Sequence, residues 1–396
     1  MLRFPGFEDS GGWGNPLIED FFNVGSSKRV LQKDWTTHGV PFYRTRELVS
    51  LSKGEPFSSE IFISDEQFSS LSEKYGMPSK GDFLVSGVGT LGISYQVQQD
   101  DRFYFKDGNV LWLAKKNGIN STYFKYCFES DWIQNQIIGQ TSKSTVGTYT
   151  IQNAKKTSFW SPPSLEEQQK IADCLSSLDE LITAHTQKHQ ALLSYKKGLL
   201  QNLFPAEGET VPALRFPEFE DSVGWAIKPM KKLFRIGNGK DHKHLADGDI
   251  PVYGSGGYMR SVDDYLYDGE SACIGRKGTI DRPIFLSGKF WTVDTLFYTH
   301  SFKNCSPKFI YLIFLNIDWR SQNEAGGVPS LSKSNIEKIE VAVPSLDEQQ
   351  KIADCLSSLD ELITAQSKKI EDLKAHKKGL MQQLFPAMDE SDYQVQ

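Results

Sequence analysis

Two long stretches of the chain carry a seven-residue hydrophobic repeat, which is typical of coiled-coil helices. The first is formed by Ile171, Leu178, Leu192 and Leu199, with Leu175, Ile182 and Leu203 beside them, and the second by Ile352, Leu359, Leu373 and Leu380. Each stretch opens after a proline with Ser-x-x-Glu, at 164–167 and at 345–348, which predicts a helix start with a capping box. Each continues for about 40 residues to a Phe-Pro pair, so we expect two helices of roughly 60 Å.

The two predicted helices are copies of each other. Residues 167–184 return unchanged at 348–365, and 29 of 41 positions match between 165–205 and 346–386. A second block, LRFPGFEDSGGW at 2–13, returns as LRFPEFEDSVGW at 214–225, so the chain is a tandem duplication. We expect the helices to pack as an antiparallel pair, with the polar seam residues His185 and Gln366 close together and helping to fix the register. The alternative is that these two side chains merely face solvent.

A divergent segment precedes each helix, and the two segments share a skeleton. GDFLVSGVGTLG at 81–92 resembles GESACIGRKGTI at 269–280. Each is followed by an aromatic-rich strand, from Val110 or Phe290, and by an amphipathic helix beginning near Asn120 or Ser306. We therefore predict an α+β protein with one fold used twice, two long helices in an antiparallel coiled coil, and pseudo-twofold symmetry. The predicted parts are a variable domain with its lead-in (1–163), a central helix (164–205), a second variable domain with its lead-in (206–344), a distal helix (345–388) and a tail (389–396).

Composition excludes several classes of protein. The 396 residues are 39% hydrophobic and 24% charged, which is typical of a soluble globular chain. The longest apolar run, Phe309 to Leu315, is far shorter than the ~20 residues of a membrane span, and the N-terminal sequence lacks the pattern of a signal peptide, so we expect a cytoplasmic protein with no membrane partner. Five cysteines without a Cys-x-x-Cys pair argue against disulfides and structural zinc. A net charge of -6 means that any nucleic-acid contact must use local basic surface.

No catalytic pattern is complete. SPPS at 161–164 resembles the Pro-Pro-aromatic motif of amino-methyltransferases, but Ser164 stands where the aromatic residue is needed, so a helix lead-in is favoured. GNGK at 237–240 lacks the spacing of a phosphate-binding P-loop. His242 and His244 lack further metal ligands nearby and are expected to be surface histidines. We expect no catalytic residue and no metal site in this chain.

Basic loops are the remaining candidates for chemistry. Residues 228–243 hold six Lys or Arg against one acid, and residues 28–46 hold five against one. Arg276-Lys277-Gly278 follows a predicted strand, where an arginine can contact a guanine edge with two hydrogen bonds while the glycine lets the backbone approach. Each cluster alone is commonly a solvated face. Their presence in two divergent domains joined by stiff helices favours contact with two separated DNA sites.

These features together resemble the specificity subunits of type I restriction-modification systems, over essentially the whole chain. The resemblance rests on the duplicated variable domains, the LRFP-x-F lead-ins, PSLEEQQKIA at 163–172, PSLDEQQKIA at 344–353, YGSGG at 253–257 and IGRKGTI at 274–280. It implies two target recognition domains, each recognising one half of a bipartite asymmetric site in double-stranded DNA. It further implies helices that set the spacing and bind two N6-adenine methyltransferase subunits, alongside restriction and translocase subunits. The chain itself would be non-catalytic and without a cofactor, while the partners would bind S-adenosylmethionine, ATP and Mg²⁺.

The resemblance also implies which residues contact DNA. In the second domain these are Tyr253, Ser255, Arg276 and Lys277, with Lys240, Lys243, Ser330 and Lys333 on neighbouring loops. In the first domain they are Arg44, Arg46, Thr90, Lys143 and Thr145. SGVGT at 86–90 departs from the pattern because it lacks the Arg-Lys pair, which implies two different half-sites. The alternatives are a coiled-coil adaptor without a DNA-binding role and a self-sufficient methyltransferase or nuclease.

Overall fold

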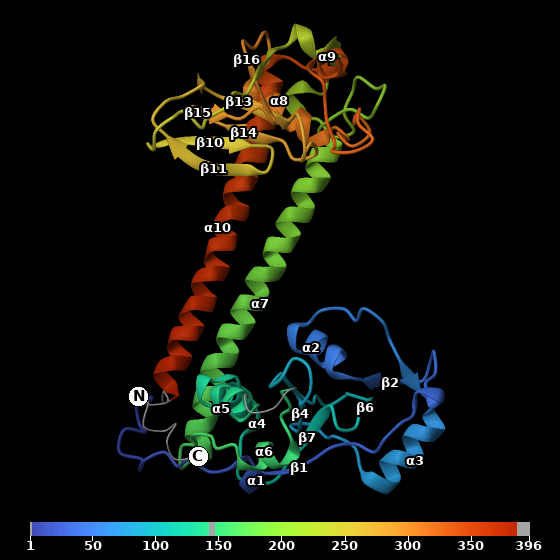
Figure 1. Cartoon of the computed structure of the whole chain (residues 1–396), viewed down its shortest axis with the longest axis vertical. Helices are drawn as coiled ribbons and strands as arrows, with labels where there is room; N and C mark the ends of the chain where they lie inside the picture. The colour runs from blue at the N-terminus through green and yellow to red at the C-terminus, as the bar shows by residue number, and fades with distance from the viewer. Residues whose placement is uncertain (1, 142–146, 386–396) are drawn as a thin grey trace. The chain divides into compact units, whose positions relative to one another are not determined.

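The structure is a computed structural model that describes residues 2–141 and 147–385 and divides into two compact units (Figure 1). Unit 1 comprises Met1–Ala184 with Ile370–Gln396, and unit 2 comprises His185–Lys369. Each unit therefore holds one variable domain, the first part of the helix that follows it and the last part of the other long helix. Within the described residues, none of the helices combines the length and the apolar character that a membrane span requires.

Unit 1 is built on an antiparallel sheet of order β1-β7-β4-β5 and a smaller sheet of order β3-β2-β6 in which β2 and β6 are parallel. The strands are β1 (Phe22–Gly25), β2 (Val40–Tyr43), β3 (Phe62–Ile63), β4 (Phe83–Ser86), β5 (Ser94–Gln96), β6 (Tyr104–Phe105) and β7 (Val110–Lys115). The helices are α1 (Ile18–Phe21), α2 (Thr45–Lys53), α3 (Asp65–Tyr75), α4 (Ser121–Glu129), α5 (Asp131–Thr141) and α6 (Ile151–Lys156), with a 3-10 turn at Gln32–Asp34.

Unit 2 repeats this plan with sheets of order β14-β13-β16-β9 and β11-β10-β15-β12, and it adds a two-stranded β17-β8 ribbon. The strands are β8 (Ala226–Pro229), β9 (Arg235–Asn238), β10 (Ile250–Gly254), β11 (Gly257–Val262), β12 (Tyr267–Asp268), β13 (Ser271–Gly275), β14 (Ile284–Leu286), β15 (Lys289–Thr292), β16 (Leu296–His300) and β17 (Glu340–Val343). The helices are α8 (Pro307–Asn316) and α9 (Lys333–Lys338), with 3-10 turns at Pro217–Phe219 and Met230–Lys232.

The two variable domains share one topology. The order β9-β16-β13-β14 corresponds to β1-β7-β4-β5, and in both units a parallel pair, β10 with β15 or β2 with β6, has an antiparallel neighbour. The helices predicted to begin near Asn120 and Ser306 are α4 and α8, whose N-termini those two side chains cap. The prediction of one α+β fold used twice is confirmed.

The long helices are α7 (Leu165–Asn202) and α10 (Leu346–Leu384), and in each unit their segments run antiparallel. In unit 1, Lys377 donates to Asp179 over 2.7 Å, and in unit 2 Lys196 pairs with Asp360. These four residues are related by the same 181-residue repeat, so both units use one contact. The apolar seam continues into the domain cores, where Leu175 packs near Phe385 in unit 1 and Leu356 near Phe204 in unit 2.

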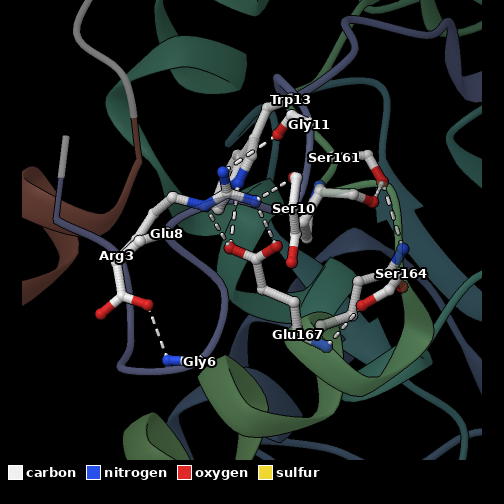
Figure 2. Close-up of polar contacts among 11 residues, drawn as sticks. Arg3, Gly6, Glu8, Ser10, Gly11, Trp13, Ser161, Ser164 and Glu167 are labelled. Atoms are coloured by element: carbon white, nitrogen blue, oxygen red, sulfur yellow. Dashed lines mark hydrogen bonds and ion pairs between the residues drawn. The ribbon is translucent and has the colours of Figure 1, made fainter.

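At each helix start only one of the two contacts of the predicted capping box forms. Ser164 and Ser345 accept hydrogen bonds from the backbone N–H of Glu167 and Glu348, as expected. The predicted return contact of each glutamate to its own cap is wrong. Both oxygens of Glu167 instead accept from the Arg3 guanidinium, at 2.9 and 2.7 Å, and the Trp13 indole adds a third bond at 3.2 Å (Figure 2). The repeated lead-in therefore serves to hold a buried carboxylate at the helix start.

His185 and Gln366 form the predicted polar contact. Nε2 of Gln366 lies 2.6 Å from Nδ1 of His185 and donates to its backbone carbonyl at 2.9 Å. Gln366 is 8% exposed, so this amide is a buried polar group within a seam of apolar residues. Because the two residues occupy the same position in the two repeats, they pair only in the observed register, which supports their role in fixing it.

We expect Gln366→Leu alone to lower the stability of the helix pair by about 1 kcal/mol, because Nδ1 of His185 loses its partner inside the seam. Replacing both residues with leucine removes both polar groups together and is expected to restore stability or raise it. Urea unfolding followed by far-UV circular dichroism measures both effects. Equal stability of the single and double variants would contradict a buried hydrogen bond at this point.

Candidate nucleic-acid interface

One edge of unit 2 gathers loops that are far apart in the sequence, and Thr295 joins them. The backbone N–H of Ser255, just after β10, donates to Oγ1 of Thr295 at 3.4 Å. The backbone N–H groups of Arg276 and Lys277, just after β13, donate to the Thr295 carbonyl at 2.8 and 3.4 Å. The turn between β15 and β16 therefore sets the position of both loops.

The Arg276 loop is also tied to the segment before α9. The carbonyl of Arg276 accepts from Leu331 at 2.9 Å, and Lys277 pairs with Ser330 as an isolated β-bridge. Gly278 has a φ of +85°, which favours glycine, and a side chain there would lie 3.3 Å from Oγ of Ser255. The structure thus brings Ser255, Arg276, Lys277 and Ser330 to one place.

Lys240 and Lys243 flank a hollow beside this edge. The N–H of Lys240 donates to Thr292 at 2.8 Å, and its carbonyl accepts from the Trp291 indole at 2.9 Å, so the loop after β9 is held against β15. The hollow is lined by Asp241, His242, Lys243, Gly254, Ser255, Gly256, Gly257, Tyr258, Met259, Val293, Asp294 and Thr295. Tyr253 lies next to this lining, half-buried, with its ring 6.1 Å from that of Tyr258.

Lys333 lies on a helix, whereas the sequence analysis placed it on a loop. It is the first residue of α9, after the N-cap Ser332, and its ammonium lies 3.8 Å from Glu337 one turn along the helix. The other four predicted cations of unit 2 differ from Lys333 in this respect. Lys240, Lys243, Arg276 and Lys277 are exposed, and none forms an ion pair with the described residues. These four side chains are therefore available to an anionic ligand.

The equivalent edge of unit 1 carries different side chains. Gly87 takes the place of Arg276, since its N–H donates to Asn109 at 2.8 Å and its carbonyl accepts from Tyr149 at 2.9 Å. A side chain on Gly87 would lie 2.7 Å from the Tyr149 carbonyl, so no arginine fits here. Val88 pairs with Thr148 as Lys277 does with Ser330. Thr90 is exposed on this loop, whereas Lys143 and Thr145 lie outside the described residues.

Arg44 and Arg46 lie at the C-terminal end of β2, the position that YGSGG occupies at the end of β10. Both arginines form ion pairs within the protein. Glu47, which is 3% exposed, accepts from both guanidinium groups. Burial opposes ionisation of Glu47, but these hydrogen bonds outweigh it and keep its pKa below the ordinary value. Arg44 also lies over the Trp35 ring. The spacing of Arg44 and Glu47, three residues apart at a helix start, was a signal for this pairing.

Two residues at the unit 2 edge could not be found from the sequence. Thr295 belongs to no motif, and its role appears only when β10, β13 and β15 are brought together. Asp294 beside it is an exposed carboxylate among the four exposed cations. The edge therefore offers cations, hydroxyl groups and an acid together, the combination that recognises phosphates and base edges.

The described ranges hold no cluster of side chains suited to a metal ion. No three His, Cys, Asp or Glu side chains are grouped as a metal site would require among residues 2–141 and 147–385. Burial raises the pKa of the Cys273 thiol to about 12 and that of Cys305 to about 11, which disfavours their reactive thiolates.

Comparisons with known proteins identify a single family. The model of the type I restriction modification DNA specificity domain matches residues 11–194 and 222–375. A putative type I restriction enzyme specificity subunit of Haemophilus influenzae is 28% identical over 178 residues, which are 44% of this chain and 42% of that protein. The putative MjaX specificity subunit of Methanocaldococcus jannaschii is 24% identical over 340 residues, 77% of each chain. The chain thus spans under half of the first relative and about three quarters of the second.

Solved structures share the fold. The S subunit of a type I restriction-modification system from M. genitalium superposes with a TM-score of 0.64 at 16% identity, over 98% of this chain and 100% of that one. A chain from a structure describing complex assembly and conformational transition of the type I R-M system gives 0.58 at 13% identity, over 96% and 98%. At these identities the likeness shows the shared architecture alone.

Proposed function

The chain belongs to the type I restriction modification DNA specificity family, and we propose that each of its two units recognises one half of a bipartite asymmetric DNA site. One observation carries the proposal. The two units present the same strand ends on the same scaffold, with Arg276 and Lys277 in unit 2 and Gly87 and Val88 in unit 1. A shared scaffold with different side chains at one edge is what recognition of two different sequences requires.

The proposed mechanism divides the contacts by chemistry. Lys240, Lys243 and Lys277 contact phosphates and position the unit, while Arg276 donates two hydrogen bonds to a guanine edge. Thr90 and Arg46, which is 52% exposed, are the described candidates in unit 1. The chain contributes no catalytic group in this scheme. Methylation with S-adenosylmethionine, and cleavage with ATP and Mg²⁺, belong to partner subunits.

We further propose that the block repeated in the two long helices, 167–184 and 348–365, binds two copies of one methyltransferase subunit. Leu181 and Leu362 are 47% and 57% exposed and lie in the block that is identical in both repeats. Packing within the chain does not explain two exposed leucines kept at the same position. A partner that binds once to each repeat explains both leucines, because apolar surface of this kind is typical of a protein interface.

Genome-wide mapping of N6-methyladenine tests the proposal. The chain is co-expressed with its candidate methyltransferase subunit in a methylation-free host. We expect one bipartite motif with fixed spacing that disappears when this chain is omitted. A stable complex without methylation, and with DNA affinity that is weak and insensitive to salt, would favour the adaptor alternative, because phosphate contacts lose affinity steeply as salt rises. Methylation or cleavage by the isolated chain would favour a self-sufficient enzyme.

Arg276→Ala is expected to reduce discrimination at one base pair of one half-site by about 1–3 kcal/mol, because the bidentate contact to guanine is lost. The other half-site should keep its full discrimination. Methylation rates on duplexes substituted at each position measure the effect and show which half-site belongs to unit 2. Arg235→Ala is the matched control, because Arg235 is also exposed but lies at the far end of the β9-β16 pair, opposite His300. Equal loss in both variants would contradict the assignment.

A further inference from the structure

Asp294 is an exposed acid on the edge that carries Lys243, Arg276 and Lys277, and Asp241 is a second exposed acid in the hollow. It is the second residue of the turn between β15 and β16, in which the N–H of Leu296 donates to the Val293 carbonyl at 2.9 Å. Its neighbours in the hollow include Lys243 and Ser255, and the next residue, Thr295, holds the Arg276 loop. A carboxylate here repels DNA phosphates, so it is suited to a base edge and not to the backbone.

The backbone around Asp294 is fixed on both sides. The N–H of Val293 donates to the Tyr253 carbonyl at 2.9 Å, and the carbonyl of Thr295 accepts from Arg276 at 2.8 Å. The carboxylate is therefore carried by the same rigid turn that sets the Arg276 and Ser255 loops. A group held this way loses little conformational entropy when it binds a ligand.

The carboxylate has no structural task in the described part of the chain. An aspartate in a turn commonly accepts a hydrogen bond from the backbone two residues further on. The Asp294 carboxylate accepts none from the described residues, and it forms no ion pair with the nearby exposed cations. Burial does not explain it either, because the residue is exposed.

The corresponding turn of unit 1 also carries an aspartate. There the N–H of Val110 donates to the Lys106 carbonyl at 3.3 Å. The N–H of Lys106 donates to the Tyr43 carbonyl, and the equivalent bond in unit 2 runs from Val293 to the Tyr253 carbonyl. Asp107 follows Lys106 as Asp294 follows Val293. The unit 1 turn is one residue longer, because Asn109 accepts from Gly87 as Thr295 accepts from Arg276 and Gly108 stands between Asp107 and Asn109. Both turns thus carry an acid directly after the residue that contacts the neighbouring strand end.

We infer that Asp294 is a specificity-determining residue that accepts a hydrogen bond from the exocyclic amino group of a cytosine in the half-site recognised by unit 2. A carboxylate accepts hydrogen bonds and donates none, and cytosine N4 is the major-groove donor that Asp and Glu contact. Arg276 on the adjoining loop recognises guanine, so the edge is suited to a G·C-containing sequence. This inference rests on the proposed function, because it assumes that this edge contacts DNA.

The experiment uses the complex of this chain with its methyltransferase subunit and duplexes of the mapped motif. In one duplex the relevant cytosine is replaced by 2-pyrimidinone, which lacks the 4-amino group. We expect the native complex to methylate this duplex about 10- to 100-fold more slowly than the cytosine duplex. Asp294→Ala should methylate the two duplexes at rates within about threefold of each other, since the contact is already lost. Asp268→Ala is the matched control, because it removes an exposed carboxylate from unit 2 at the other end of β15, opposite Lys289.

The outcomes separate the two proposals. Absence of any sequence-specific methylation by the native complex would overturn the proposed function, and this inference with it. A mapped motif whose unit 2 half-site, identified with Arg276→Ala, contains no cytosine would overturn the inference alone. The same holds if the native complex tolerates loss of the amino group, or if Asp294→Ala keeps the full difference. The measurement on the native complex stands even if the variant fails to fold.

Discussion

Replacing Arg215 with methionine is expected to lower the stability of unit 2 by about 3–5 kcal/mol, because it leaves a buried carboxylate without its counter-charge. Arg215 donates to both oxygens of Glu348 at 2.8 Å, and the Trp225 indole donates to the same carboxylate at 3.1 Å. The side chains of the ion pair are 6% and 2% exposed, so water cannot replace the lost partner. Urea unfolding followed by tryptophan fluorescence measures the change.

Two variants make the comparison specific. Lys351→Met breaks an exposed pair of similar length, 2.8 Å to Glu218, whose side chains are 49% and 47% exposed, and it should cost less than about 1 kcal/mol. Replacing Arg215 and Glu348 together with methionine should recover much of the loss, since neither buried charge then remains. If Arg215→Met costs no more than Lys351→Met, the lead-in does not stabilise the helix start as argued. Arg3→Met in unit 1 should have a somewhat smaller effect, because Arg3 is 15% exposed.

Replacing both Leu181 and Leu362 with lysine is expected to weaken binding of the methyltransferase subunit by at least about 100-fold. Each change places a charge in an apolar contact that has to be desolvated on binding. Each single variant should retain one of the two proposed sites, so the complex should fall from two bound subunits to one. Light scattering after size-exclusion chromatography measures this stoichiometry, and calorimetry measures the affinity.

Leu193→Lys is the matched control for this pair. Leu193 is 40% exposed on α7, but its counterpart in the second repeat is Lys374, so the position is not kept between the copies. We expect normal binding and an unchanged helical content. Unchanged binding in the Leu181 and Leu362 double variant, or equal loss in the control, would place the partner elsewhere on the chain.

The candidate interface was predictable only in part. Tyr253, Ser255, Arg276 and Lys277 stood out in the sequence because glycine-rich turns and paired cations form short motifs. Arg44 and Arg46 were expected to contact DNA, whereas the structure engages both with Glu47, and the spacing of Arg44 and Glu47 indicated the first of these contacts. Thr295 and Asp294 carried no signal, because their neighbours come from strands that are separate in the sequence.

By itself, the sequence determined the duplication, the two long helices and the polar contact at their seam. These features depend on regular spacing along one helix and on the identity of two copies, and both are local properties. The tertiary structure alone decided where each polar group finds its partner. Glu167 pairs with Arg3, 164 residues away, and not with its own helix cap. The folded lead-in brings a guanidinium to this carboxylate, whose burial without a partner would cost free energy. The pairing of distant strands likewise decided which acids and cations of the described residues stay exposed at the candidate interface.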